Sequence, residues 1–336
     1  MGMTITRPGL YSTVQDRGRI GYRQYGVVVS GAMDDVSHRI ANWLVLNDGG
    51  AATVEMTMTG ISAVFEEDTF VAFTGADAKI QADGKEIPMW RPVFLPAQCE
   101  IHVKQMKQGS RVYMAVAGGI DVPVVLESRS TFQRGGFGGF NGRILAKGDE
   151  LEIGESNKTV QSVTDSLSSE HPKVMGTNWG VAYGVYSCLN SDSIRCIKGS
   201  EYEFFDQAAK DSFFNKPYQI TPKSDRMGFR LEGSELTLQE AKEMISEAVA
   251  FGTVQVPSDG QPIILMADRQ TTGGYPKIAN VIGADLSCLA QKLPGNTITF
   301  KEVSLAEAHR IYRDREHELK TLRNSIELKW RKEMKK

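Results

Sequence analysis

The hydrophobic positions in the first half of the chain recur with the period of β-strands. Apolar and polar side chains alternate over 53–58, which is typical of a half-buried strand. An Asp-Gly pair at 83–84 predicts a tight hairpin turn between two further strands. Many short strands separated by glycine-rich turns favour a barrel or a sandwich. The expected strands lie at residues 53–58, 70–73, 79–81, 86–88 and 111–117.

A helical spacing interrupts this strand-rich half once. Val36, Ile40, Trp43 and Leu44 recur at spacings of three to four residues, and Asp34 or Asp35 can cap the start of the helix. The Asp-Gly-Gly sequence that follows is typical of a helix end. We therefore expect one helix packed against the strands.

The second half of the chain repeats the mixture of strands and helices. Residues 194–197 and 262–267 are apolar runs of strand length. Capping boxes that begin at Ser200 and Thr237 predict two helices. Both halves are thus expected to be mainly β with helices, in two barrels.

The chain between the halves and at its end is polar. Residues 155–172 are rich in serine and are closed by a proline, which is the composition of a linker. Residues 301–336 hold 11 Lys and Arg against 7 Asp and Glu. A capping box at Ser304 and a narrow apolar stripe predict a long C-terminal helix. Because charged residues interrupt the stripe, we expect this helix to be frayed and solvated.

The composition is that of an ordinary folded protein. Of 336 residues, 41% are hydrophobic and 24% are charged, and the net charge of −2 gives no overall field for nucleic acid or an anionic membrane. Four cysteines in a chain of this length do not form a disulfide framework. No stretch of 18 apolar residues occurs. We expect a cytoplasmic protein.

Several common catalytic motifs are absent from the sequence. No G-x-x-x-x-G-K-[ST] loop exists to hold ATP phosphates, and the glycines of 135–142 do not form G-x-G-x-x-G. The five histidines include no H-x-H or H-E-x-x-H, so no metal site is expected from this chain. Sequence alone does not exclude a Ser-His-Asp triad, because the fold brings its members together.

The densest polar cluster in an apolar setting is the block 268–277, which directly follows the strand expected over 262–267. A strand end that leads into a Gly-Gly turn lets side chains and backbone N–H groups converge on a ligand. A carboxylate can act as a base, a guanidinium can hold an anion, and amide and hydroxyl groups supply neutral hydrogen bonds. The alternative is a structural turn in which Asp268 and Arg269 merely pair.

Two further clusters draw attention. Arg134 and Arg143 flank a Gly/Phe loop, whose phenylalanines either plug the core or contact a partner. Asp16-Arg17 and Asp225-Arg226 stand in similar glycine-containing turns, a faint echo between the two halves. Buried Asp–Arg pairs that brace these turns are the expected explanation, because one guanidinium can satisfy several carbonyls.

Several blocks taken together resemble the biotin-dependent carboxyltransferase family (allophanate hydrolase subunit 2, urea amidolyase-related), in its branch of 5-oxoprolinase C subunits, or KipA proteins. The resemblance spans roughly residues 4 to 310 and is far more specific than any single motif. It covers 5–22, 29–34, 73–77, 117–120, 224–233, 255–263 and 268–277.

The resemblance implies a fold of two tandem cyclophilin-like β-barrel domains, which we place at 1–154 and 173–303. The linker at 155–172 and the charged helix at 304–336 come from the residue pattern, and the chain after residue 310 lies outside the resemblance. It implies a catalytic contribution from Asp268, Arg269, Gln270 and Thr272 at a site shared with another chain. The substrate-binding residues expected beside them are Thr271, Gly273, Gly274, Tyr275, Lys277 and Arg134, and the structural turns are Asp16, Arg17, Asp225 and Arg226.

The implied activity is the ATP-dependent opening of 5-oxo-L-proline to L-glutamate, together with the A and B subunits of a 5-oxoprolinase, of which the second is like KipI and allophanate hydrolase subunit 1. The chain is not expected to be active alone, and ATP is expected to be bound wholly or partly by the partners. One alternative is a regulator that binds KipI, an inhibitor of a sporulation kinase. Another is a carboxyltransferase component that acts on urea or a related amide.

The sequence departs from the family's pattern in two places. No Ala-Met-Lys-Met occurs, so we do not expect this chain to use biotin. The family's usual Pro-Gly-Pro appears here as Lys198-Gly199-Ser200, which puts any role of that turn in doubt.

Overall fold

The computed structural model describes residues 2–169, 173–186, 191–240, 242 and 244–333. The chain divides into two compact units, each made of separate stretches. Unit 1 comprises Met1–Arg19, Ser30–Cys188 and Leu319–Lys336, and unit 2 comprises Ile20–Val29 and Leu189–Glu318. We expected each domain to be one continuous stretch of chain, whereas the segments of the two units alternate along the sequence. Packing joins segments that are distant in sequence, and composition does not encode that packing.

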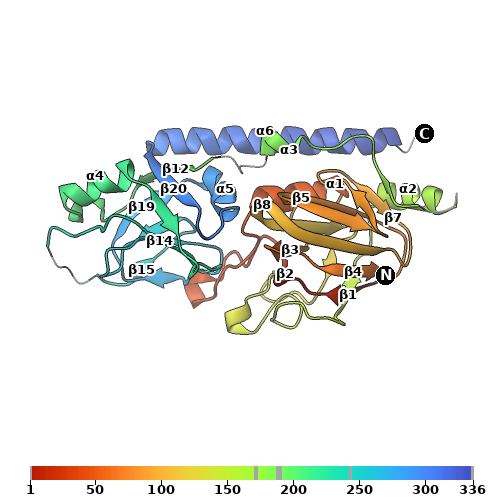
Figure 1. The fold of residues 1–336 in the computed structure, drawn as a ribbon, viewed down its shortest axis with the longest axis horizontal. Helices are drawn as coiled ribbons and strands as arrows, with labels where there is room; N and C mark the ends of the chain where they lie inside the picture. Colours follow the sequence, from red (N-terminus) through yellow and green to blue (C-terminus); the bar gives the residue numbers. More distant parts are fainter. Residues whose placement is uncertain (1, 170–172, 187–190, 241, 243, 334–336) are drawn as a thin grey trace. The chain divides into compact units, whose positions relative to one another are not determined.

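Unit 1 is built on an 11-stranded sheet with the hydrogen-bonded order β11-β7-β5-β8-β4-β1-β10-β9, to which β2, β3 and β6 are attached. The long strands β5 (Thr69–Ala82) and β8 (Glu100–Val116) pair along most of their length (Figure 1). The other strands are β1 (Gly2–Arg7), β2 (Tyr11–Gln15), β3 (Thr53–Thr57), β4 (Ser62–Phe65), β6 (Lys85–Ile87), β7 (Val93–Leu95), β9 (Ile120–Asp121), β10 (Glu150–Ile153) and β11 (Met175–Gly176). The helical elements of this unit are α1 (Asp35–Leu44), η2 (Gln133–Gly135), α2 (Lys158–Ser168) and α3 (Tyr183–Tyr186).

Two local predictions for unit 1 are confirmed. Asp83 and Gly84 both have positive φ in the turn between β5 and β6, as a two-residue hairpin turn requires. Helix α1 begins where expected, because the carboxylate of Asp34 accepts a hydrogen bond from the Ser37 N–H at 3.0 Å. Its apolar face lies on β5 and β8.

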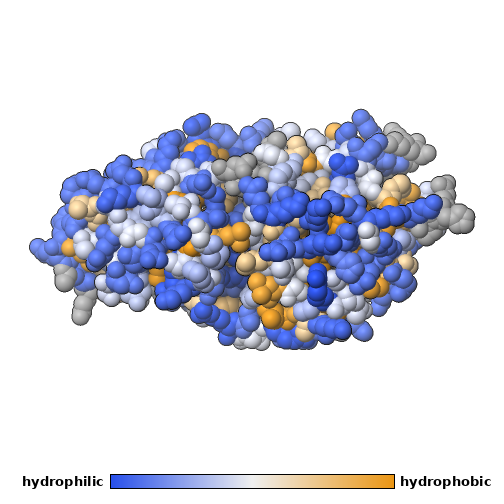
Figure 2. Space-filling view, in the orientation of Figure 1, coloured by the Kyte–Doolittle hydropathy of each residue, from blue (hydrophilic) through white to orange (hydrophobic). Residues whose placement is uncertain are grey.

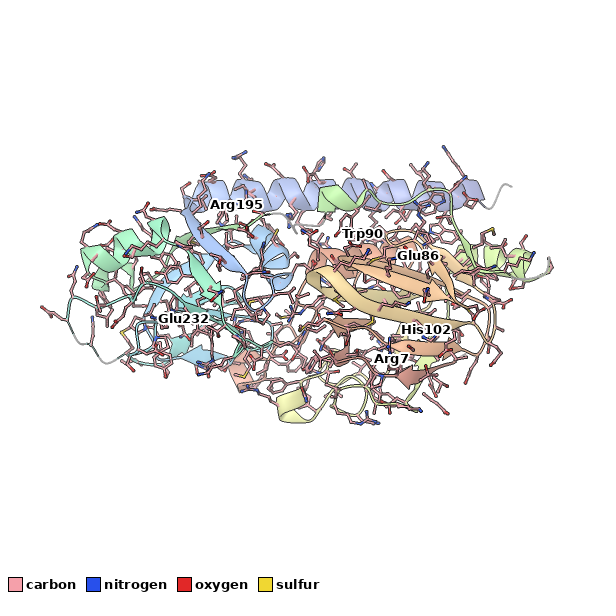
Figure 3. All side chains as sticks on the ribbon, in the orientation of Figure 1. Arg7, Glu86, Trp90, His102, Arg195 and Glu232 are labelled. Carbon is pink, nitrogen blue, oxygen red and sulfur yellow. The ribbon has the colours of Figure 1, made fainter. Side chains whose placement is uncertain are left out.

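Unit 2 is a closed seven-stranded barrel with the order β12-β19-β16-β17-β14-β13-β20. Helix α4 covers it through Phe213, which stacks on Phe300 with ring centroids 4.4 Å apart. Arg195, labelled in Figure 3, extends from β12 and pairs with Asp285 at 2.6 Å. The barrel strands are β12 (Ser193–Lys198), β13 (Tyr218–Ile220), β14 (Gly228–Glu232), β16 (Thr253–Gln255), β17 (Ile263–Leu265), β19 (Lys277–Val281) and β20 (Thr297–Glu302). The remaining elements are η1 (Arg23–Tyr25), η3 (Tyr202–Phe204), α4 (Gln207–Asn215), η4 (Gly283–Asp285), α5 (Leu286–Ala290) and a small separate sheet of β15 (Glu247–Ala248) and β18 (Thr272–Gly273).

Both helices predicted from capping boxes in this half are wrong. The segment after Ser200 forms only the short η3, because the Glu203 carboxylate, which would complete the capping box, pairs with Lys210 at 2.6 Å. No helix begins at Thr237 in the described residues, since its hydroxyl donates to Asp206. Asp206 is the residue that caps α4.

The two polar segments are also more ordered than composition suggested. The expected linker contains α2, whose Val160 is fully buried in unit 1. The last helix, α6 (Leu305–Glu333), is continuous rather than frayed. Its second half packs on unit 1 through Trp330, whose indole Nε1 donates to the Leu44 carbonyl at 2.9 Å. Buried aromatic contacts outweigh the charged residues that interrupt the stripe.

The fold class expected from the sequence is confirmed: the protein is mainly β with helices, and it has a closed barrel and a C-terminal helix. Among the described residues, no helix is both long and apolar enough to cross a bilayer. On the face shown in Figure 2, apolar residues form separate patches between hydrophilic ones.

Candidate functional site

The block 268–277 lies in unit 2, where β17 ends and the chain turns toward β19. The strand before the turn is Ile263–Leu265, shorter than expected. The turn then adds β18, which pairs with β15 in the register Glu247↔Gly273. The structure therefore confirms a strand end that leads into a glycine turn, and it shows a second short strand supporting that turn.

Asp268 is held by a buried ion pair with Arg226. The Asp268 Oδ2 and Oδ1 lie 2.9 Å and 3.1 Å from Nε and Nη2 of Arg226. The Asp268 N–H also donates to the Arg226 carbonyl at 2.8 Å. Since both carboxylate oxygens are engaged, Asp268 can orient the turn but is poorly placed to act as a base. The sequence also left open a structural turn in which Asp268 pairs with Arg269. The structure instead pairs Asp268 with Arg226.

We expected Arg226 to pair with its sequence neighbour Asp225; the structure shows a buried ion pair between Arg226 and Asp268. The Asp225 carboxylate instead accepts the N–H groups of Met227 and Gly228, at 2.8 and 3.2 Å. An Asp side chain that bonds the backbone two residues ahead is a common turn motif. The Arg226 side chain turns inward to Asp268 on the neighbouring part of the barrel.

Arg269 is a buried cation with few acceptors. Its Nη1 donates to the Met266 carbonyl at 3.3 Å, and its guanidinium carbon lies 5.5 Å from the centre of the Phe251 ring. Within the described residues, its Nε has no hydrogen-bond partner. Burial, and then the positive charge of Arg23, lower the pKa of Arg269 to about 10. Arg269 thus stays charged at neutral pH, and a nearby anion would stabilise it.

Lys277 is tied to two carboxylates. Its Nζ lies 3.2 Å from Glu201 and 3.1 Å from Glu247. Although burial opposes the charged form, the hydrogen bonds to Glu247 and Glu201 raise the pKa of Lys277. Its ammonium group therefore fastens β15 to the barrel, and it is not available to a substrate in the way the sequence suggested.

Other members of the block are more accessible. Gln270 and Thr272 are exposed, and Tyr275 is 47% exposed. Thr271 and Gly274 are partly exposed. A cavity of about 620 Å³ begins at Gly274, Tyr275 and Pro276, and residues 235–238 and 256–258 form other parts of its wall. The side chains of Gln270 and Thr272 are accessible to solvent and lie outside the residues that line this cavity.

Gly273 is required by its surroundings. A Cβ atom at this position would clash with Nε2 of Gln255, a side chain that is almost fully buried. The turn thus passes directly over Gln255, whose Nε2 has no hydrogen-bond partner among the described residues. A larger residue would lift the turn from the barrel.

Arg134 lies in η2 of unit 1, whereas the block lies in unit 2. It is exposed on the Gly/Phe loop. Of the two phenylalanines, Phe137 packs under the guanidinium of Arg19, 4.8 Å from the ring centre, and Phe140 packs against the unit 1 core. Core packing, one of the two alternatives for these rings, is therefore confirmed for Phe140, whereas Phe137 is half-buried against Arg19 and Phe132.

The expected Asp16–Arg17 pair does not exist. Arg17 pairs with exposed Asp35 at 3.1 Å. The Asp16 carboxylate instead accepts hydrogen bonds from the hydroxyls of Ser128 and Ser130 at 2.7 and 2.5 Å. Although burial opposes it, these hydrogen bonds lower the pKa of Asp16. Asp16 is a structural residue, but its partners are hydroxyl and backbone groups.

Sequence reasoning missed the residues that fix the block from outside it. Arg23, Glu201, Glu247 and Gln255 all contact the block or its supporting strand. They lie between 18 and 248 positions from the residues they touch. What brings these residues to the block is the pairing of strands, such as Gly228↔Leu265 between β14 and β17. No local sequence pattern predicts that pairing. Within the described residues, no group of three or more His, Cys, Asp or Glu is placed to hold a metal ion.

Comparisons with known proteins agree on a family. The family model "Carboxyltransferase domain, subdomain A and B" matches residues 25–302. The C subunit of 5-oxoprolinase from Escherichia coli is 41% identical over 316 residues, which are 94% of this chain and 95% of that protein. The protein of the same name from Haemophilus influenzae is 38% identical over 319 residues, 95% of this chain and 96% of that protein.

Larger proteins contain a similar segment. Urea amidolyase of Saccharomyces cerevisiae is 31% identical over 332 residues, which are 95% of this chain and 17% of that protein. The crystal structure of Kluyveromyces lactis urea carboxylase matches with a TM-score of 0.85 and 27% identity, over 95% of this chain and 29% of that one. This chain therefore resembles one segment of those proteins, and nearly the whole of the bacterial subunits.

Proposed function

We propose, because this chain belongs to the carboxyltransferase-domain family, that it is the C subunit of a 5-oxoprolinase. In this proposal it acts with two partner subunits to open 5-oxo-L-proline to L-glutamate while ATP is hydrolysed. The similarity to two bacterial C subunits over nearly the full length of both chains supports it. The partners supply the nucleotide site wholly or in part, since this sequence has no Walker loop.

One feature of the site carries the proposal: a turn whose backbone is fixed by a buried ion pair while neutral polar side chains stay exposed. Gln270 and Thr272 can hydrogen-bond to the N–H and C=O of a lactam. Arg269 supplies positive charge for an anionic group, and the Asp268–Arg226 pair holds the turn in place. These are positioning and electrostatic roles, which suit a site completed by another chain.

The chemistry gives the partners a defined task. A lactam is a poor electrophile, and transfer of the γ-phosphoryl group of ATP to its oxygen creates a leaving group. Water then adds to the activated carbon, the C–N bond breaks and the nitrogen takes a proton, which leaves an acyl phosphate. A second water adds to the carbonyl carbon of this acyl phosphate, so that phosphate leaves and the side-chain carboxylate is formed. The products are L-glutamate, ADP and phosphate.

A second candidate is a carboxyltransferase component that acts on urea or a related small amide. The similarity to the fungal urea amidolyase and urea carboxylase favours it. In that case biotin would have to come on another polypeptide, because this chain has no Ala-Met-Lys-Met sequence. Binding to a KipI-like B subunit is compatible with either candidate.

Reconstitution with single omissions tests the proposal. The chain is mixed with the A and B subunits from the same organism, and L-glutamate and ADP are measured with 5-oxo-L-proline as the substrate. We expect stoichiometric glutamate and ADP from the complete mixture and none when this chain is left out. Undiminished turnover without the chain would refute the proposal. Carboxylation of urea by carboxybiotin in place of lactam opening would establish the second candidate.

A further inference from the structure

Residues 20–29 come from the connection between β2 and α1, yet they belong to unit 2. The segment forms η1, Arg23–Tyr25, which ends at Gly26 with positive φ. A short stretch of the first half of the sequence is thereby built into the unit that carries the candidate site.

The guanidinium of Arg23 reaches the small sheet that supports the site. Its Nη2 donates to the carbonyls of Val249 and Thr271, the latter at 3.4 Å. Val249 directly follows β15, and Thr271 directly precedes β18. The N–H of Val249 also donates to the carbonyl of Thr271 at 3.2 Å. Arg23 therefore closes the sheet at the end where the chain enters from Gln270.

The other end of the sheet is fastened by a different contact. Glu247, the first residue of β15, pairs with Lys277 of the barrel at 3.1 Å. With two residues in each strand, the sheet has too few hydrogen bonds of its own to be rigid. Its geometry therefore depends on these two side-chain contacts.

We propose that Arg23 is a positioning residue of the site: it fixes the backbone of Thr271 and Thr272 and so sets where Gln270 and Thr272 meet the substrate. The inference deepens the proposed function and rests on it for its kinetic readout. A lysine does not replace Arg23 fully, because its shorter side chain places the ammonium short of the Nη2 position from which both carbonyls are bonded. Displacement of reacting groups by about 1 Å is enough to reduce turnover on the order of 100-fold.

The test compares Arg23→Ala and Arg23→Lys with a matched control, Arg310→Gln. Arg310 is an arginine of the same unit, 63% exposed and 3.8 Å from Asp314. In the reconstituted complex we expect Arg23→Ala to lower kcat about 10- to 100-fold with a smaller change in KM. Added guanidinium should restore part of kcat, and methylammonium should not. Arg23→Lys should stay impaired, and the control should match the wild type.

Hydrogen exchange of the isolated chain supplies a readout that needs no activity. We expect Arg23→Ala to speed exchange of the amides at 247–249 and 271–273 while the barrel strands keep their protection. If the wild-type complex does not open 5-oxo-L-proline, the proposed function fails, and the exchange result still decides the role of Arg23. Unchanged exchange, or unchanged kcat in an active complex, would overturn the inference. So would a loss of kcat that accompanies global destabilisation and is not rescued by guanidinium.

Discussion

Removal of one member of the Asp268–Arg226 pair should destabilise unit 2 strongly. Both side chains are buried, and two nitrogen–oxygen contacts of 2.9 and 3.1 Å join them. At an effective dielectric constant of about 20, unit charges roughly 3 Å apart attract by about 5 kcal/mol. Asp268→Ala leaves the guanidinium buried without this partner, and such a loss costs about 3–5 kcal/mol.

Differential scanning calorimetry of the isolated chain measures this effect. For a unit of this size, about 1 kcal/mol corresponds to a shift of roughly 2–4 °C, so the transition of unit 2 should fall by about 6–20 °C. The double variant Arg226→Met with Asp268→Leu carries no unpaired charge. We therefore expect it to be more stable than Asp268→Ala.

The matched control is Arg17→Ala, which breaks the exposed pair with Asp35 at 3.1 Å in unit 1. Exposed pairs contribute about 0–1 kcal/mol, so this variant should shift the melting temperature little. A shift below about 2 °C for Asp268→Ala, or a double variant as unstable as the sum of the single variants, would refute the reasoning.

Three further outcomes follow from the structure. Trp330→Ala should lower the free energy of unfolding of unit 1 by about 3–5 kcal/mol, since a fully buried indole and its hydrogen bond to Leu44 are lost. An unchanged calorimetric transition would mean that the end of α6 is frayed after all. Gly273→Ala should cost about 1–3 kcal/mol and reduce turnover, because a methyl group has no room there; wild-type kinetics and stability would contradict this. Burial lowers the pKa of His38 from 6.5, so the unfolded chain binds this proton more tightly than the folded chain does. The free energy of unfolding should therefore fall as the pH drops below 6.5 toward the folded pKa. The His38→Gln variant should lack this contribution, and the same dependence of unfolding free energy on pH in variant and wild type would exclude it.

Local patterns in the sequence predicted the parts of the fold that depend on neighbours in the chain. The hairpin at Asp83 and Gly84 follows from turn chemistry, and the start of α1 follows from its cap. The strand end before Asp268 follows from an apolar run. Each signal lies within a few residues of the feature that it specifies.

Predictions failed where a distant group competes for the same side chain. Ser200 and Glu203 have the pattern of a capping box, but the Glu203 carboxylate pairs with Lys210, and the intervening Glu201 bonds to Lys277, 76 positions away. Thr237 has the same pattern and bonds to Asp206. A capping box stabilises a helix only when its side chains have no stronger partner, and that partner is visible only in the folded chain.

The candidate site shows the same division. Composition and glycine spacing located the block 268–277, but pairing by sequence proximity joined the wrong charges. Arg226 reaches Asp268 across 42 positions, and Arg23 reaches Thr271 across 248. Which side chains are fixed and which remain open to a ligand therefore depends on tertiary contacts. Gln270 and Thr272 are left exposed because neighbouring residues, and not they themselves, hold the turn.

The most direct test of the account is glutamate release by the assembled complex when this chain carries Gln270→Ala together with Thr272→Val. Both side chains are on the surface, so we expect assembly with the partners and thermal stability to be retained. Release of L-glutamate should fall by at least about 100-fold, because the polar groups that we propose to face the lactam are gone. Wild-type rates from a correctly assembled double variant would show that the turn takes no part in the reaction.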